Sequence, residues 1–118
     1  MRVELLALSL VVSILAGGEA RAGEVYRQLN ASEIQARFVG KEVTDEVHWS
    51  YRFAPRGRLY VVSLGRASTG RWRFKGDALC LGAEPCTQVW MAGSRVEFRR
   101  DDGTLPEEGV LKAPASRF

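Results

Sequence analysis

Apolar and polar residues alternate along much of the chain beyond residue 46, which is the pattern of strands with one buried face. In residues 47–53, four apolar side chains are predicted to face one way and three polar ones the other: Val47, Trp49, Tyr51 and Phe53 against His48, Ser50 and Arg52. The other predicted strands are 59–64, 71–75, 78–81, 86–91, 95–99 and 105–111. Pro106 cannot donate to a ladder, so we expect the last of these at an edge.

Turn-forming residues separate these strands. Pro55 and Gly57 end the first one, and the small residues 65–70 are predicted to form a connection. Residues 101–103 read Asp-Asp-Gly, a strong hairpin signal. Six or seven short strands at a spacing of about 8–12 residues are typical of an antiparallel meander that curls into a small barrel or half-barrel.

One helix is predicted before the strands, over residues 31–39. Asn30 stands at the N-cap, and Glu33 follows three residues later in the capping-box position. Ile34 and Phe38 are four residues apart and share a face. The fold class is therefore mainly β (α+β), with a short helix that covers an open end or face of the sheet.

The first 22 residues have the pattern of a secretory signal peptide. Arg2 supplies a positive charge, residues 5–16 are almost wholly apolar, and residues 20–22 read Ala-Arg-Ala, a cleavage signature. The alternative is a transmembrane anchor, but twelve residues of helix span roughly 18 Å, short of the ~30 Å hydrocarbon core. We expect cleavage near Ala22 and one domain over residues 23–118, frayed after about residue 113.

These features predict a periplasmic or secreted protein that is not integral to a membrane, because no later segment is long and apolar enough to cross one. The chain has one His and two Cys, too few for zinc clusters, iron–sulfur clusters or several haems. A haem held by His48 and Met91 would lack the Cys-x-x-Cys-His attachment motif. We therefore expect no metal and no cofactor.

The two cysteines, Cys80 and Cys86, are predicted to form a disulfide, as an even count in an exported chain indicates. Gly82 and Pro85 between them favour a turn that the bridge would clamp. The alternatives are a redox pair and a metal site. Five intervening residues do not match the Cys-x-x-Cys of thiol oxidoreductases, and two thiols alone make a poor metal site.

Short motifs stand out at three places. Residues 29–34 read Leu-x-x-x-Glu-Ile and precede Gly40, residues 70–72 read Gly-x-Trp, and residues 76–80 read Gly-Asp-x-Leu-Cys before the second cysteine. This combination resembles a group of small exported proteobacterial proteins of unknown function, over residues 29–98. The resemblance implies export and a small β-rich fold. It implies no catalytic residue, because no activity is assigned to the group and its motifs are structural.

The charges are unevenly distributed. The formal net charge is +3, yet the interval between Glu46 and Asp77 holds seven cations and no acid. Six of these cations are candidate anion-binding residues: Arg52, Arg56, Arg58, Arg71, Arg73 and Lys75. Outside the cytoplasm such a face suits lipopolysaccharide phosphate, an anionic lipid surface, an acidic glycan or an acidic protein, and nucleic acid is disfavoured. The simpler alternative is a solvated face in an arginine-rich protein.

Catalytic residues are sparse. His48 follows Asp45 and Glu46 closely, so a carboxylate–imidazole pair for acid–base chemistry is conceivable, but a lone surface histidine is the simpler interpretation. The serines lack the Gly-x-Ser-x-Gly context of a nucleophile elbow: Ser63, Ser68 and Ser94.

The aromatic residues are predicted to face inward, where they either fill the core or line a ligand pocket: Trp49, Tyr51, Phe53, Tyr60, Trp72, Phe74, Trp90 and Phe98. The terminal Phe118 is also found in outer-membrane barrels, but the short strands here do not fit one. We therefore expect an exported, non-enzymatic binding or interaction module with a cationic face. The alternatives are a small-molecule carrier and a small hydrolase.

Overall fold

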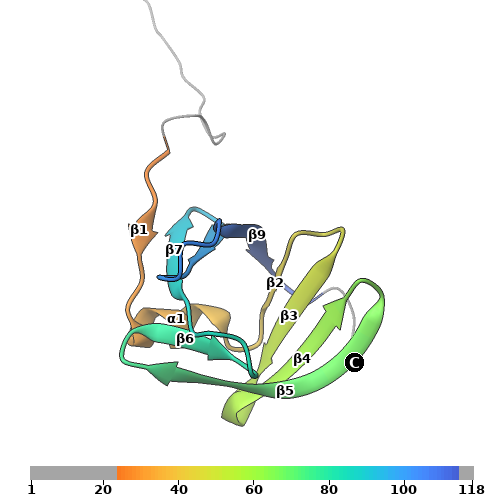
Figure 1. The fold of residues 1–118 in the computed structure, drawn as a ribbon. Coiled ribbons are helices and arrows are strands. Elements are labelled where there is room, and N and C mark those ends of the chain that lie inside the picture. The colour runs from red at the N-terminus through yellow and green to blue at the C-terminus, as the bar shows by residue number, and fades with distance from the viewer. Residues whose placement is uncertain (1–23, 115–118) are drawn as a thin grey trace, which may run out of the picture.

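A computed structural model describes residues 24–114 of the chain. They form one antiparallel nine-stranded sheet, in the order β1-β7-β8-β9-β2-β3-β4-β5-β6, that curls into a half-barrel (Figure 1). The elements are β1 (Arg27–Gln28), α1 (Ala31–Phe38), β2 (Glu42–Thr44), β3 (Trp49–Ala54), the 3₁₀ turn η1 (Pro55–Gly57), β4 (Arg58–Ser63), β5 (Arg66–Lys75), β6 (Ala78–Leu81), β7 (Gln88–Ala92), β8 (Arg95–Arg99) and β9 (Glu107–Lys112). The predicted fold class is confirmed, with more strands than expected. The predicted signal peptide lies outside the described residues.

The curled sheet is joined to itself at one place. Leu79 of β6 and Thr87, just before β7, exchange two backbone hydrogen bonds of 2.8 Å each. The predicted disulfide is present beside this bridge, between Cys80 and Cys86. A loop of this size stabilises a fold by about 2 kcal/mol in the chain-entropy account. Bridge and disulfide together hold β6, at one end of the sheet, against the start of β7, which is the second strand from the other end.

The helix agrees closely with its prediction. The Asn30 side chain accepts a hydrogen bond from the Glu33 N–H (2.8 Å), and the Glu33 carboxylate accepts one from the Asn30 N–H (2.9 Å). This is a complete capping box. The helix ends before Gly40, whose φ of 85° is one that glycine adopts without strain. The Ala31 N–H donates to Asp77 at 2.9 Å, which ties the start of α1 to the turn between β5 and β6.

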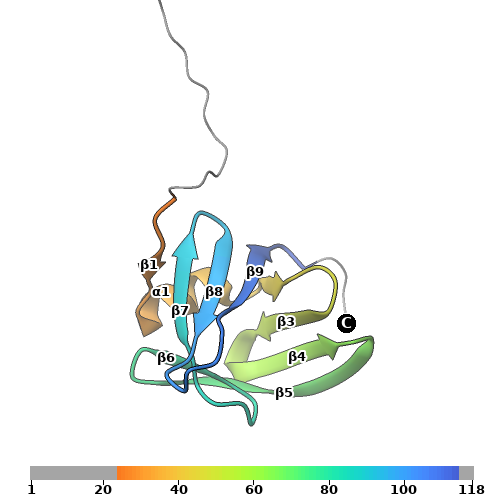
Figure 2. The same ribbon diagram turned by 45° about the horizontal axis from the view of Figure 1, so that its top comes forward.

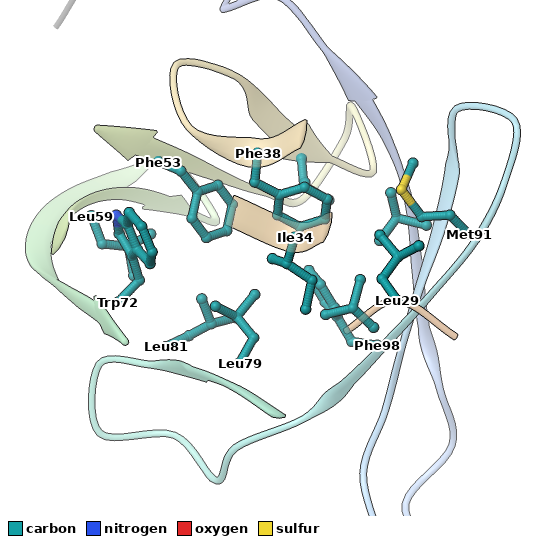
Figure 3. Packing of buried hydrophobic residues seen from close by; sticks show 13 residues of the cluster. Leu29, Ile34, Phe38, Phe53, Leu59, Trp72, Leu79, Leu81, Met91 and Phe98 are labelled. Carbon is teal, nitrogen blue, oxygen red and sulfur yellow. The ribbon is translucent and has the colours of Figure 1, made fainter. Parts of the chain in front are cut away.

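The core lies between α1 and the inner face of the sheet. Figure 3 shows Ile34 and Phe38 of the helix in the middle of the cluster, with Phe53 and Trp72 on one side and Met91 on the other. All of these are buried, and the Trp72 indole N–H donates to the Ala54 carbonyl at 2.9 Å.

Among the described residues, no helix has the length and apolar character of a membrane span.

The strand at 47–53 begins later than predicted. The Asp45 carboxylate accepts hydrogen bonds from the N–H groups of Val47, His48 and Trp49, which folds residues 45–48 into a turn. The prediction that Val47 faces the core is therefore wrong, since it is 78% exposed.

The predicted connection at 65–70 is also wrong. Residues 66–70 belong to β5, which pairs with β4 from Arg66 opposite Ser63 to Arg71 opposite Arg58 (Figure 2). The turn between β4 and β5 therefore consists only of Leu64 and Gly65, both with positive φ.

The last strand is not at an edge. β9 lies between β8 and β2, and Pro106 stands just before its first residue, so the ladder loses no donor. The expected inward positions of Trp90 and Tyr60 are wrong as well. Val89 and Leu59, their neighbours in the chain, occupy the buried face, and alternation places Trp90 and Tyr60 on the outer one.

Candidate anion-binding site

The register of β4 and β5 brings two arginines together. Arg58 and Arg71 stand directly opposite each other on the two strands. Their chain neighbours Leu59 and Trp72 are buried, so alternation places both arginines on the outer face, where they are exposed. Like charges directly opposite on neighbouring strands are destabilising. Neither guanidinium forms an ion pair with a carboxylate of residues 24–114, so the repulsion is not relieved within the described fold.

The turn η1 positions one of these guanidinium groups. Arg71 Nη2 donates to the carbonyl oxygen of Arg56 at 3.2 Å. Gly57 lies beneath it with φ of 76°, and a Cβ there would meet Arg71 Nη2 at 3.3 Å and the Trp72 carbonyl at 3.2 Å. Glycine is therefore required at this position both for the backbone conformation and for the space that the guanidinium occupies.

A hollow of about 200 Å³ lies between the two arginines. It is lined by Arg58, Tyr60, Thr69 and Arg71, together with the backbone of the two strands. Two guanidinium groups beside hydroxyl donors are the groups that recognise phosphate, sulfate or carboxylate oxygens.

The other predicted anion-binding residues are arranged less closely. Arg73 and Lys75 continue the outward row of Arg71 along β5, opposite Cys80 and Ala78 of β6, and both are exposed. Arg52 is half-buried on β3 and stands opposite Glu42, so its environment includes a carboxylate. We define the cationic face as the other five predicted residues, without Arg52: Arg56, Arg58, Arg71, Arg73 and Lys75.

The carboxylate–imidazole pair exists, but its geometry is that of a turn. His48 Nδ1 lies 2.8 Å from Asp45 Oδ2. The other carboxylate oxygen, Oδ1, accepts the hydrogen bonds from the backbone N–H groups of residues 47–49. Partial loss of hydration opposes ionisation, yet the hydrogen bonds from Trp49, Val47 and His48 outweigh it and hold the pKa of Asp45 well below its usual value.

His48 also lines a hollow of about 530 Å³. The Ser50 hydroxyl in that hollow donates to Glu42 at 3.0 Å, and no hydrogen bond joins Ser50 to the imidazole. The nucleophile–base contact of a serine hydrolase is therefore not formed by these residues.

The sequence analysis missed a buried polar group at the rim of the half-barrel. Arg100 has a side chain only 12% exposed, and its Nη2 lies 3.7 Å from Glu84 and 3.8 Å from Glu107. Burial, followed by the charges of Glu107 and Glu84, raises the pKa of the neighbouring Tyr51. Nothing in the pattern around residue 100 signals this burial, because it comes from the path of the β8–β9 loop.

The interior is filled on one side of the half-barrel. The rings of Trp49 and Tyr51 pack 5.3 Å apart, and each lies 6.2 Å from Phe98. A hollow of about 270 Å³ remains near β5, with Tyr51 and Val61 among its lining residues. The aromatic residues thus act mainly as core.

Compared with known proteins, the chain has no significant match to a family model, to a curated protein or to a solved structure. The resemblance to small exported proteobacterial proteins therefore stays a prediction. Within the described range, no three His, Cys, Asp or Glu side chains gather as a set of metal ligands.

Proposed function

We propose that this protein is an exported, non-enzymatic module that binds an anionic partner through the cationic face. The observation that carries the proposal is the placement of Arg58 opposite Arg71, with no carboxylate of residues 24–114 paired to either. Such a pair opposes folding slightly, and an anion that bridges the two guanidinium groups would turn repulsion into attraction.

The surrounding structure supports this role. The Arg56 carbonyl holds the Arg71 guanidinium in place, which lowers the entropy lost when an anion binds. Thr69 and Tyr60 add hydroxyl groups at the same hollow. The row continues along β5 through Arg73 and Lys75, so an extended anion meets several positive charges on one strand.

The two alternatives have less support. A small-molecule carrier needs an open interior, whereas Trp49, Tyr51 and Phe98 fill one side of it, and the hollow of about 270 Å³ on the other side is below the roughly 300–1,000 Å³ of typical ligand pockets. A hydrolase with a Ser–His pair needs a serine hydroxyl in contact with an imidazole, whereas Ser50 donates to Glu42 and His48 Nδ1 is paired with Asp45.

Binding to heparin and to polyglutamate tests the proposal. The double variant Arg58→Gln/Arg71→Gln should bind both about tenfold more weakly and show a shallower salt dependence. The matched control is Arg37→Gln/Arg95→Gln, which removes the same charge from exposed positions on α1 and β8. Equal losses in the two double variants would show that net charge alone attracts the anions, and the proposal would fail.

A further inference from the structure

β5 has an edge that no described strand covers. Residues 66–71 pair with β4 on one side, whereas β6 pairs only with residues 72–75. Figures 1 and 2 both show β6 beside one half of β5, with the other half running next to β4 alone. The second edge of residues 66–70 therefore faces solvent.

The backbone groups at this edge can be assigned from one hydrogen bond. The Arg71 carbonyl accepts from the Gly82 N–H at 2.8 Å, so Arg71 directs its backbone groups away from β4. Backbone groups alternate along a strand, and Thr69 and Ala67 therefore direct their N–H and C=O groups to the same edge. No hydrogen bond within residues 24–114 uses them. Two donors and two acceptors stand in ladder order.

Arg66, at the start of β5, is the one charged residue of this edge, and the four residues that follow it do not protect the edge. Natural edges are usually blunted by proline, an inward-pointing charge or a bulge. Here Ala67, Ser68 and Thr69 are small, uncharged and exposed, and Gly70 follows them. The edge has the properties of a strand that accepts another one.

A hollow lies directly beside the edge. It has a volume of about 270 Å³, with Ser68 and Gly70 on the β5 side and Gly82 and Glu84 on the other. An added Cβ at Gly70 would meet only the Cα of Gly82, at 3.9 Å, so the space next to the strand is open. A strand placed along the edge would direct every second side chain into this hollow.

The charges select the partner. The remaining side chains of the added strand would lie on the outer face, diagonal to Arg71 on the neighbouring strand and two strand spacings, about 10 Å, from Arg58 on β4. Acidic residues at alternate positions satisfy these cations. A second copy of this chain, paired edge to edge, would bring its own Arg71 to the same face and add repulsion.

We infer that the open edge of β5 binds an extended acidic peptide by antiparallel strand addition, with small side chains in the hollow and carboxylates on the cationic face. The inference rests on the proposed function and names its partner. Antiparallel pairing is the arrangement of every neighbouring pair in the sheet.

The test uses an alternating threonine–aspartate peptide, with a threonine–asparagine peptide as the neutral control. Thr69→Pro removes the outward N–H and leaves the ladder with β4 intact, and Thr69→Val keeps the N–H as the matched control. We expect about tenfold weaker binding to Thr69→Pro, and binding within about twofold of the unaltered protein for Thr69→Val. Bound peptide should slow amide exchange at Ala67 and Thr69.

A second arm places the change in the peptide, so it does not depend on how Thr69→Pro folds. In antiparallel addition the residues that hydrogen-bond to β5 are those whose side chains face outward, here the aspartates. N-methylation of the aspartates should abolish binding, and N-methylation of the threonines should leave it within about threefold.

Each of these results would overturn the inference: equal binding to Thr69→Pro, equal binding of the peptide N-methylated at its aspartates, unchanged exchange at Ala67 and Thr69, equal binding of the asparagine peptide, or an edge-to-edge dimer in sedimentation. Heparin and polyglutamate binding that depends on Arg58 and Arg71, without any binding of the alternating peptide, would reject the inference alone. Loss of that dependence would reject the proposed function.

Discussion

On the two sides of the half-barrel, Arg99 and the Arg58–Arg71 pair have different surroundings. On the side formed by β7, β8 and β9, Arg99 donates from Nε to Glu97 at 2.8 Å. Its guanidinium also lies 4.1 Å from the centre of the Trp90 ring and 5.9 Å from that of Tyr26. On the side formed by β4 and β5, Arg58 and Arg71 face each other with neither a described carboxylate nor a described aromatic ring as a partner.

The inner faces of the two sides also differ, in how tightly they are packed. Gly109 of β9 has its side-chain position filled, because a Cβ there would lie 2.9 Å from the Trp49 ring and 2.8 Å from the Thr44 carbonyl. Gly70 of β5 faces the open hollow, with Gly82 as its nearest contact. The lack of a side chain is needed for packing at Gly109, whereas at Gly70 it leaves space in the hollow.

This difference bears on the simpler interpretation of the cationic interval, which is an arginine-rich composition. Arg99 on the β7–β9 side is paired and packed, so the composition does not leave every arginine without a partner, although Arg95 of the same side is exposed and has no ion pair among the described residues. The β4–β5 side combines two arginines without a carboxylate partner among residues 24–114, an edge that no described strand covers, and a hollow.

The two glycines give the largest expected effect. Gly109→Val should lower the free energy of unfolding by about 3 kcal/mol, because the Thr44 backbone cannot move aside easily. Gly70→Val should change it by less than about 1 kcal/mol, since the hollow accepts the side chain. Urea denaturation measures both. Comparable losses in the two variants would mean that the interior is filled on both sides.

The arginines give the next effect. Arg99→Ala should lower the free energy of unfolding by about 1 kcal/mol, through loss of the Glu97 hydrogen bond and the contact with Trp90. Arg58→Ala should leave it unchanged or raise it slightly, because it relieves the repulsion with Arg71. Thermal denaturation in low salt compares the two. A loss at Arg58 as large as that at Arg99 would contradict the contrast between the sides.

Local signals in the sequence predicted the parts of the fold that depend on neighbouring residues. Asn30 and Glu33 defined the start of α1, and the cysteine count gave the disulfide. The first half of β5 was missed because residues 66–70 are small and lack an apolar alternation. Pairing with β4 through a two-residue turn makes this segment a strand, and such pairing is a property of the register.

The candidate site was predicted in composition but not in arrangement. Arg58 precedes the predicted strand at 59–64, yet it is the first residue of β4 and stands opposite Arg71 on β5. Trp90 was placed in the core, yet it packs on Arg99 at the surface. Which arginine finds a partner depends on the register of strands far apart in the sequence, and no local pattern contains that information.

The smallest expected effect concerns the turn at 45–48, where β2 of one side continues into β3 of the other. Its hydrogen bonds hold the pKa of Asp45 below the usual value, so the fold favours the ionised carboxylate. The resulting stability is present above the ordinary pKa of an aspartate, about 4. It is lost as the pH falls toward and through the lower pKa that Asp45 has in the folded protein. The Tm of the protein should therefore fall more between about pH 5 and pH 2 than that of Asp45→Asn. Asp101→Asn, in the loop between β8 and β9, should follow the unaltered protein, and parallel curves for all three would show that the turn at 45–48 adds no pH-dependent stability.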